Sequence, residues 1–545
     1  MLQSSLLKIS SLFILQLVFL QTSSYGQFTA ADSLRGGYGI TRQWWDLKYY
    51  DLDVEFFPDR QEISGKNDLV FDLGVIRETY ILQFDLQAPL IIDRIEFNGK
   101  QLELSQLKTI GNAHLMDLTR ETILPKSNHF VVHYHGQPRK AVNPPWDGGV
   151  IWRKDKNGLP WISIACQGLG ASVWFPCKDS QADEPDGVRM TYTCPSNIKC
   201  ISNGILEKSV DNPNGTSSYT WKVTNPINNY CMIPYFGDYV NHHDHFAGEN
   251  GQLEVDYWVL RDDLEKAIPH FEDVNKTLKA FEYWFGPYPF YNDGYKIVQA
   301  PHLGMEHQSA IAYGNQFKKG YMGRDLSGTG QGLNWDFIIV HESGHEWFGN
   351  NITTKDIADM WVHESFTNYS EVLFTEYWFG KEAADTYCHG LRKNIQNDKP
   401  IIGKYSVQDE GSGDMYYKGS NMLHTIRCLV QDDALFREML RNMNQQFYHQ
   451  TVSGRQIEVF MSKMLKMELS PIFDQYLRQQ YPPTLEVKNI RGGVKYRWVN
   501  CVKGFDMPLV VNGKLWKCSS KWTKRSLKLP YDFTIEPNLY IIVKK

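Results

Sequence analysis

Residues 337–345 read FIIVHESGH, and residues 361–371 read WVHESFTNYSE. The first stretch contains the pattern HExxH within an apolar run that is typical of a helix. Because a helix turns once every 3.6 residues, His341 and His345 lie one above the other, and both imidazoles can bind one metal ion. The pattern therefore predicts a zinc site with these two ligands, and it places Glu342 beside the water that the metal activates.

A third ligand is expected from the second stretch. Eighteen residues separate His345 from Glu364. A helix, a turn and a second helix would bring the Glu364 carboxylate back to the imidazoles and leave a fourth position open, as catalytic zinc requires. The alternative is that these are ordinary residues in salt bridges between helices. We expect one Zn²⁺ per chain, with Glu342 acting as general base and then as general acid.

The composition is typical of a multidomain globular protein. The chain has 545 residues, of which 42% are hydrophobic and 14% aromatic, so it can bury several cores. The formal net charge is -5, whereas a nucleic-acid-binding protein usually carries a basic surplus. The nine cysteines are dispersed and form neither a disulfide framework nor a CxxC metal motif. Nucleic acid is therefore not an expected partner.

The sequence pattern divides the chain into three regions. Residues 50–56 alternate apolar and acidic side chains, as a half-buried strand does, and similar short runs continue to about residue 251. Apolar residues then recur at helical spacing, and strand patterns return after Pro482 and Pro483. We predict a multidomain α+β protein, with a β-rich N-terminal domain over 27–251, a mostly helical catalytic domain over 252–482 and a small β-sandwich over 483–545.

The first 26 residues are predicted to form a secretory signal peptide. Lys8 precedes an apolar run from Ile9 to Leu20, and small residues follow near Ser24 and Gly26. A membrane anchor is the competing interpretation, but this run is shorter than the roughly 20 residues that a spanning helix needs. We expect cleavage after Gly26 and export to the periplasm or the medium, with no membrane span in the mature chain.

Three further segments accompany the two zinc stretches. LGMEH stands at 303–307, YYKG at 416–419, and ACQ at 165–167 is followed by FPCKD at 175–179. With these motifs, in this order, the chain resembles the zinc aminopeptidases of peptidase family M1, the group that contains aminopeptidase N and leukotriene hydrolase. The resemblance implies a saddle-like β-rich N-terminal domain and a thermolysin-like catalytic domain. It also implies removal of the first residue from peptides with a free N-terminus.

The resemblance implies a role for each residue at a matching position. Tyr416 would donate a hydrogen bond to the oxyanion that forms at the attacked carbonyl. Glu306 would bind the free α-ammonium of the substrate, and this contact would restrict cleavage to the first peptide bond. Gln167 would accept a hydrogen bond from the same ammonium, and Gly304 and Met305 complete the expected substrate-binding residues.

Several positions depart from the family pattern. Leu303 and His307 replace a glycine and an asparagine of the strand motif, and Gln167 stands where many members have an acid. Gly411 stands where several members have a second tyrosine, which predicts an open and mobile wall of the pocket. About 63 residues follow Pro482, and their pattern is typical of strands. We therefore expect no large helical domain over the cleft, so that peptides of about ten residues can enter it freely.

Two alternatives to an aminopeptidase belong to different classes. A zinc endopeptidase would use the same ligands, but it does not explain Met305, Glu306 or the YYKG segment. A catalytically inactive peptide-binding homologue would retain the fold, but every expected ligand, the base and the tyrosine are present. The epoxide hydrolase activity known in the family is a third possibility, which Gly411 and the lack of a C-terminal helical domain disfavour.

One histidine cluster is not explained by this function. Residues 242–245 read HHDH, which resembles a short metal-binding tract. The cluster lies close to the predicted domain boundary, and we interpret it as a solvated loop.

Overall fold

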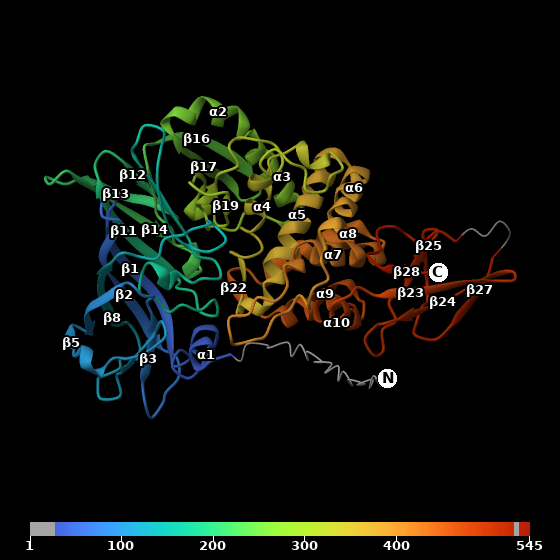
Figure 1. The fold of residues 1–545 in the computed structure, drawn as a ribbon, viewed down its shortest axis with the longest axis horizontal. Coiled ribbons are helices and arrows are strands. Elements are labelled where there is room, and N and C mark those ends of the chain that lie inside the picture. Colours follow the sequence, from blue (N-terminus) through green and yellow to red (C-terminus); the bar gives the residue numbers. More distant parts are fainter. Residues whose placement is uncertain (1–27, 528–532) are drawn as a thin grey trace, which may run out of the picture.

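A computed structural model describes residues 28–527 and 533–545. The predicted signal peptide lies outside these residues. The N-terminal strands, the central helices and the C-terminal strands follow one another across the molecule (Figure 1). This arrangement confirms the predicted multidomain α+β fold, with a β-rich first part, a mostly helical middle part and a small β part at the end.

An eight-stranded sheet with the order β13-β14-β11-β1-β2-β8-β4-β5 forms the N-terminal part. Its strands are β1 (Trp45–Phe57), β2 (Glu62–Leu73), β4 (Ile91–Phe97), β5 (Lys100–Leu102), β8 (Asn128–Gly136), β11 (Gly187–Pro195), β13 (Ile205–Asp211) and β14 (Thr216–Val223). As predicted, β1 buries Leu52, Val54 and Phe56 and exposes Asp51 and Asp53, because successive side chains of a strand point to opposite faces.

Two smaller sheets complete the N-terminal part. One has the order β12-β15-β10-β9 and the other the order β3-β7-β6. Their strands are β3 (Ile81–Asp85), β6 (Lys108–Ile110), β7 (Ala113–Asp117), β9 (Gly149–Lys154), β10 (Pro160–Ala165), β12 (Lys199–Ile201) and β15 (Tyr235–Gly237). The rings of Phe56 and Phe236, 4.4 Å apart, join β1 to β15. β10 ends just before Gln167, and the short helix α1 (Ala30–Gly36) supports the following loop, because Arg35 donates to the carbonyls of Gly168 and Leu169.

A five-stranded sheet with the order β16-β17-β18-β20-β19 begins the central part. Its strands are β16 (Tyr239–Gly248), β17 (Gly251–Leu260), β18 (Tyr295–Gln299), β19 (Gly304–Met305) and β20 (Ile311–Tyr313). The predicted boundary at residue 251 falls at the first residue of β17, just after the turn from β16, and both strands belong to this sheet. The sequence pattern changes where the helices begin, whereas the sheet of the central part already starts at Tyr239.

Helices form most of the rest of the central part. They are α2 (Leu264–His270), α3 (Glu272–Phe285), α4 (Phe337–Gly344), α5 (Trp361–Phe379), α6 (Lys381–Leu391), α7 (Tyr417–Val430), α8 (Asp433–Gln446), α9 (Gly454–Leu465) and α10 (Ser470–Arg478), with the short strands β21 (Ile352–Thr354) and β22 (Gln450–Val452) paired between them. The Asp336 side chain caps α4 by accepting from the amides of Ile338 and Ile339. α5 is buried from Trp361 to Thr375, so it runs through the core of this part.

The C-terminal part is a small sandwich of two sheets. The larger has the order β27-β24-β23-β28, and the smaller pairs β25 with β26. The strands are β23 (Thr484–Ile490), β24 (Gly493–Val499), β25 (Leu509–Val511), β26 (Lys514–Trp516), β27 (Thr523–Ser526) and β28 (Ile542–Lys544). The rings of Tyr496 and Trp516, 5.8 Å apart, pack the two sheets together. Their apolar side chains are continuous with the core of the helical part.

Two further observations concern the sequence-based expectations. All nine cysteines are unpaired thiols, and among the described residues no helix is long and apolar enough to cross a membrane. The interpretation of residues 242–245 as a loop is wrong, because they lie in β16 and pair with β17. This strand is hard to recognise in the sequence because its side chains here are polar, as those of loops usually are.

Candidate active site

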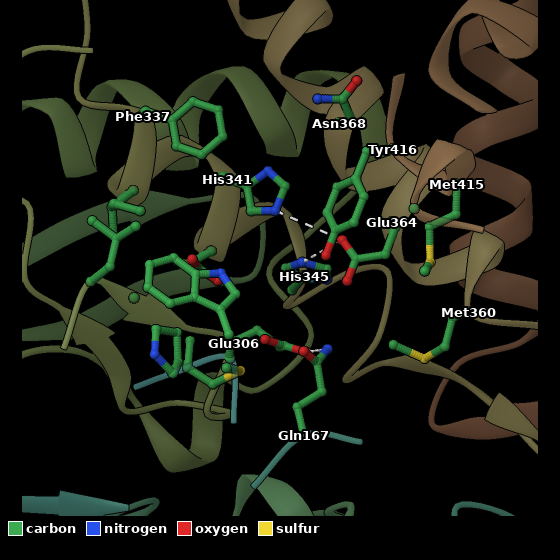
Figure 2. Close-up of a pocket in the computed structure, with 18 of the residues that line it drawn as sticks. Gln167, Glu306, Phe337, His341, His345, Met360, Glu364, Asn368, Met415 and Tyr416 are labelled. Carbon is green, nitrogen blue, oxygen red and sulfur yellow. Dashed lines mark hydrogen bonds and ion pairs between the residues drawn. The ribbon is translucent and has the colours of Figure 1, made fainter. Parts of the chain in front are cut away.

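α4 and α5 bring the three predicted zinc ligands together. Nε2 of His341 and Nε2 of His345 lie 3.8 and 3.5 Å from Oε2 of Glu364. Figure 2 shows the three side chains converging on one point of a pocket. His341 and Glu364 come from the interiors of α4 and α5, and His345 forms the C-cap of α4. The two helices expected from the spacing are therefore present, but residues 345–360 between them form a longer connection that includes β21 rather than a single turn.

The donor set fits a zinc ion. All three ligands are buried, and Oε2 of Glu364 has no hydrogen-bond partner, although such atoms are costly to leave alone. Ligand bonds of about 2.0–2.2 Å in a tetrahedral site place donor atoms roughly 3.3–3.6 Å apart, close to the distances between Glu364 and the two imidazoles. Two imidazoles and a carboxylate are also the ligand types of catalytic zinc sites.

A second layer of residues orients the imidazoles. Glu371, seven residues after Glu364 on α5, accepts from Nδ1 of His341 at 2.7 Å. Asn368 and Tyr387 donate to the same carboxylate at 2.9 and 2.6 Å. A proton on Nδ1 leaves Nε2 of His341 as the metal-binding nitrogen.

The candidate base Glu342 lies in the same buried environment. Burial raises the pKa of the Glu342 carboxyl to about 7, which suits a group that first accepts and then returns a proton near neutral pH. Gly304 on β19 passes close to it, since a Cβ added at Gly304 would stand 2.6 Å from Oε1 of Glu342. The glycine therefore leaves the space that the Glu342 carboxylate occupies.

Glu306, the candidate amine-binding residue, is held at the floor of the pocket. Gln167 and Tyr230 donate to its Oε1 at 2.5 and 2.9 Å, and Asn350 donates to its backbone carbonyl at 2.9 Å. Burial raises the pKa of the Glu306 carboxyl above its usual value. Carboxylate oxygens of Glu306 and Glu342 and a nitrogen of His345 all lie within 4.8 Å of one another, so the carboxylate is next to the candidate zinc ligands.

Tyr416 occupies the wall of the pocket at the start of α7. Its ring stacks on His341 with centroids 6.1 Å apart, and Figure 2 shows its hydroxyl pointing toward Glu364. Burial, together with the Glu364 carboxylate, holds the pKa of the Tyr416 phenol well above its usual value, so the phenol keeps its proton for donation.

The rest of the YYKG segment positions Tyr416. The buried ammonium of Lys418 donates to the carbonyls of Gln479 and Gln480, at 3.0 and 2.8 Å, and fixes the start of α7. At Gly419, an added Cβ would stand 1.9 Å from Oγ of Ser365 on α5. The glycine thus permits the close approach of α7 to α5, the helix that carries Glu364.

The pocket is a cleft of about 430 Å³ whose charged lining residues are all acidic. Four carboxylates line it, from Glu306, Glu342, Glu364 and the exposed rim residue Glu410. No lysine or arginine is among the described residues that line it. Gln167, Gly304, Met305, His341, His345 and Tyr416 also line it, so the structure brings all nine candidate site residues to one cleft.

The departures from the family pattern have local explanations. The His307 imidazole is buried away from the cleft and contacts the Tyr235 hydroxyl, while β19 still pairs with β20 through Gly304 and Met305. Gly411 does not line the cleft. It has φ +82° and its backbone meets Ile401 so closely that an added Cβ would stand 1.9 Å from the carbonyl oxygen. The backbone of Gly411 is therefore packed against Ile401, and the open and mobile wall stays a prediction.

Sequence reasoning missed several residues of the site. Glu371 could have been found, since it lies two helical turns after Glu364 on the same face of α5. Tyr230 and Tyr387 come from distant segments and carry no sequence signal. Trp146 and Met360, which also line the cleft, are likewise brought there only by the tertiary fold.

The chain is similar in sequence to known peptidases. Residues 270–476 match the model of the peptidase family M1 domain. The chain is 21% identical over 407 residues to leukotriene A-4 hydrolase of Xenopus laevis, covering 69% of this chain and 62% of that protein. It is 26% identical over 346 residues to leucine aminopeptidase 2 of Vanderwaltozyma polyspora, covering 60% of this chain and 46% of that protein.

Solved structures show the same fold. The M1 zinc metallopeptidase of Deinococcus radiodurans superposes with a TM-score of 0.68 at 19% identity, covering 81% of this chain and 95% of that one. Native yeast LTA4 hydrolase superposes with a TM-score of 0.64 at 16% identity, covering 80% of this chain and 68% of that one.

The fold and the converging ligands define a metallopeptidase-type domain with an HExxH helix. The part of the chain that matches the peptidase family M1 domain, residues 270–476, contains all three candidate zinc ligands. The chain spans about half the length of the curated relatives that it matches, for example 57% of probable aminopeptidase 1 of Sulfurisphaera tokodaii and 38% of aminopeptidase N of Lactococcus lactis.

Proposed function

We propose that this protein is a zinc-dependent aminopeptidase that removes the N-terminal residue from peptides. The observation that carries the proposal is the position of Glu306, a buried carboxylate beside His345 and the base Glu342. A free α-ammonium paired with Glu306 would leave the first peptide bond next to the base. An endopeptidase with the same zinc ligands does not bind a free α-ammonium, so it would not need the buried carboxylate of Glu306 beside the base.

His341, His345 and Glu364 would hold the zinc ion. Bound there, zinc would supply Lewis acidity and make a water molecule acidic enough to lose a proton near neutral pH. Glu371 keeps the His341 imidazole in the orientation and tautomer that metal binding requires.

The remaining chemistry belongs to residues of the chain. Glu342 takes a proton from the attacking water and returns it to the leaving amine, and burial, which raises the pKa of its carboxyl, favours the uptake of that proton. Tyr416 donates its hydroxyl proton in a hydrogen bond to the oxygen of the attacked carbonyl as negative charge develops there. β19 is the edge strand of its sheet and lines the cleft, so a peptide can lie beside Gly304 and Met305.

The charge of the cleft favours peptides longer than a dipeptide. A short substrate places its C-terminal carboxylate in a cleft lined by four carboxylates and, among the described residues, by no lysine or arginine. This repulsion decreases as the C-terminus moves out into water. We therefore infer that peptides of up to about ten residues are used at least as well as dipeptides.

Export is part of the proposal. It rests on the charged, apolar and small-residue pattern of residues 1–26, and it places the enzyme in the periplasm or the medium. The partners expected there are peptides with a free N-terminus.

A panel of aminoacyl fluorogenic substrates, assayed with and without a zinc chelator, tests the function. We expect chelator-sensitive hydrolysis that zinc restores. Hydrolysis of N-terminally blocked peptides at interior bonds would instead support the endopeptidase, and zinc binding without any hydrolysis would support an inactive peptide-binding protein.

A further inference from the structure

Strand β16 carries a second group of metal-binding side chains, on the opposite edge of the sheet from the cleft strand β19. His243 and His245 are two residues apart and share one face of β16, and Glu254 on β17 stands directly opposite His245. One ligand atom from each of the three lies within 4.8 Å of the others. Outside the cleft, no other group of this kind occurs among the described residues.

Both imidazoles face the same carboxylate oxygen. Oε2 of Glu254 lies 3.0 Å from Nε2 of His243 and 3.4 Å from Nδ1 of His245. The amide nitrogen of Gln252 lies 3.2 Å from the other oxygen of Glu254 and 3.1 Å from Nδ1 of His245, so it would have to leave Nδ1 when His245 binds an ion. Donor atoms of a tetrahedral zinc site lie roughly 3.3–3.6 Å apart, so small side-chain movements would bring the three atoms around one ion.

A second carboxylate orients one of the imidazoles. Asp256 accepts from Nδ1 of His243 at 2.8 Å, which leaves Nε2 facing Glu254. A carboxylate on one ring nitrogen is the arrangement by which proteins orient metal-binding histidines, and Nε2 would bind the ion in place of its present 3.0 Å contact with Glu254. Within the described residues, the only ion pairs of Glu254 and Asp256 are those with His243 and His245.

The neighbouring histidine does not take part. His242 points to the other face of β16, where its ring stacks on Tyr257 with centroids 5.9 Å apart. His243 and His245, by contrast, have side chains that are 47% and 51% exposed.

We propose that His243, His245 and Glu254 bind a second divalent transition-metal ion, with Asp256 orienting His243. Two imidazoles and one carboxylate favour Zn²⁺, Cu²⁺ or Ni²⁺ over Mg²⁺ or Ca²⁺. The exposed position leaves the remaining coordination places to water. Such a site binds more weakly than the buried cleft and exchanges its ion with the solution.

Zinc stoichiometry tests the proposal. The full chain, without a histidine tag, is dialysed against a series of free Zn²⁺ concentrations, and bound zinc is measured by atomic absorption. We expect a second equivalent in the wild type and in the matched control His242→Ala, and its loss in His245→Ala with peptidase activity unchanged. Asp256→Asn should keep the site but weaken it by about 10- to 100-fold.

The variant Glu364→Ala distinguishes this site from the cleft. It should lose the zinc ion of the cleft but still bind one zinc ion at His243, His245 and Glu254. Cu²⁺ bound to His341→Ala/His345→Ala, which lacks the imidazoles of the cleft, should also show nitrogen couplings in its electron paramagnetic resonance spectrum, and these should disappear when His243→Ala and His245→Ala are added. A wild type that binds no more zinc than His245→Ala would overturn the proposal, as would an equal loss in His242→Ala.

Discussion

Replacing Glu371 by glutamine tests how the candidate zinc ligands are held. The Glu371 carboxylate accepts three hydrogen bonds, from His341 at 2.7 Å, Asn368 at 2.9 Å and Tyr387 at 2.6 Å. Glutamine preserves the size of the side chain but removes its charge and one acceptor. The His341 imidazole then loses the negative partner that holds the proton on Nδ1.

The expected effect is on metal affinity. Loss of such an outer partner typically weakens metal binding by about 10- to 100-fold, which corresponds to about 1.4–2.7 kcal/mol. We expect the Kd for zinc to rise within that range when it is measured by competition with a chromophoric chelator. At saturating zinc, kcat should change less than the Kd, because His341 remains a ligand.

A matched control lies on the same helix. Glu376 pairs with Arg427 at 2.6 and 2.8 Å and does not line the cleft. Glu376→Gln therefore removes a half-buried charge from α5 without touching the zinc ligands, and it should leave the zinc Kd unchanged. If Glu371→Gln binds zinc as tightly as the wild type, the assignment of Glu371 as the residue that orients His341 is wrong.

Three further predictions concern the cleft itself. Glu364→Ala should lose zinc and activity together, whereas Glu342→Gln should retain zinc by atomic absorption and lose turnover; full zinc in Glu364→Ala would remove this carboxylate from the ligands. Tyr416→Phe should lower kcat by about 100-fold or more with little change in KM, because the lost hydrogen bond forms mainly in the transition state, and a change in KM alone would contradict that role. Gly304→Ala places a Cβ 2.6 Å from the base, so kcat should fall while zinc content and the unfolding temperature stay close to wild type; undiminished kcat would show that Glu342 adapts.

Much of the site could be predicted because its spacing is local. HExxH and the eighteen-residue interval to Glu364 predict two consecutive helices, and the structure provides them as α4 and α5, although strand β21 lies in the connection between them. The positions of Glu306 and Tyr416 followed from the family resemblance. The contacts that hold these residues, such as Tyr230 on Glu306, join distant segments and have no pattern in one sequence.

The wrong interpretation of residues 242–245 has the same cause, a contact between separate segments of the chain. Residues 242–245 are polar enough to be interpreted as a loop, but their strand forms by pairing with β17, which one local segment cannot reveal. Gly411 has φ +82° and contacts the backbone of Ile401, so the backbone itself requires a glycine at this position, a constraint that the sequence alone does not reveal.

The most direct test of the central claim compares one peptide with a free N-terminus and the same peptide N-acetylated, in the wild type and in Glu306→Gln. Glutamine keeps the side-chain volume but cannot form an ion pair with the α-ammonium. The account predicts that the wild type strongly prefers the free peptide in kcat/KM, and that this preference shrinks in Glu306→Gln while zinc content is unchanged. An equal preference in both proteins would contradict the account, because the ammonium would then be bound elsewhere, and equal cleavage of both peptides by the wild type would show that the protein is not an aminopeptidase.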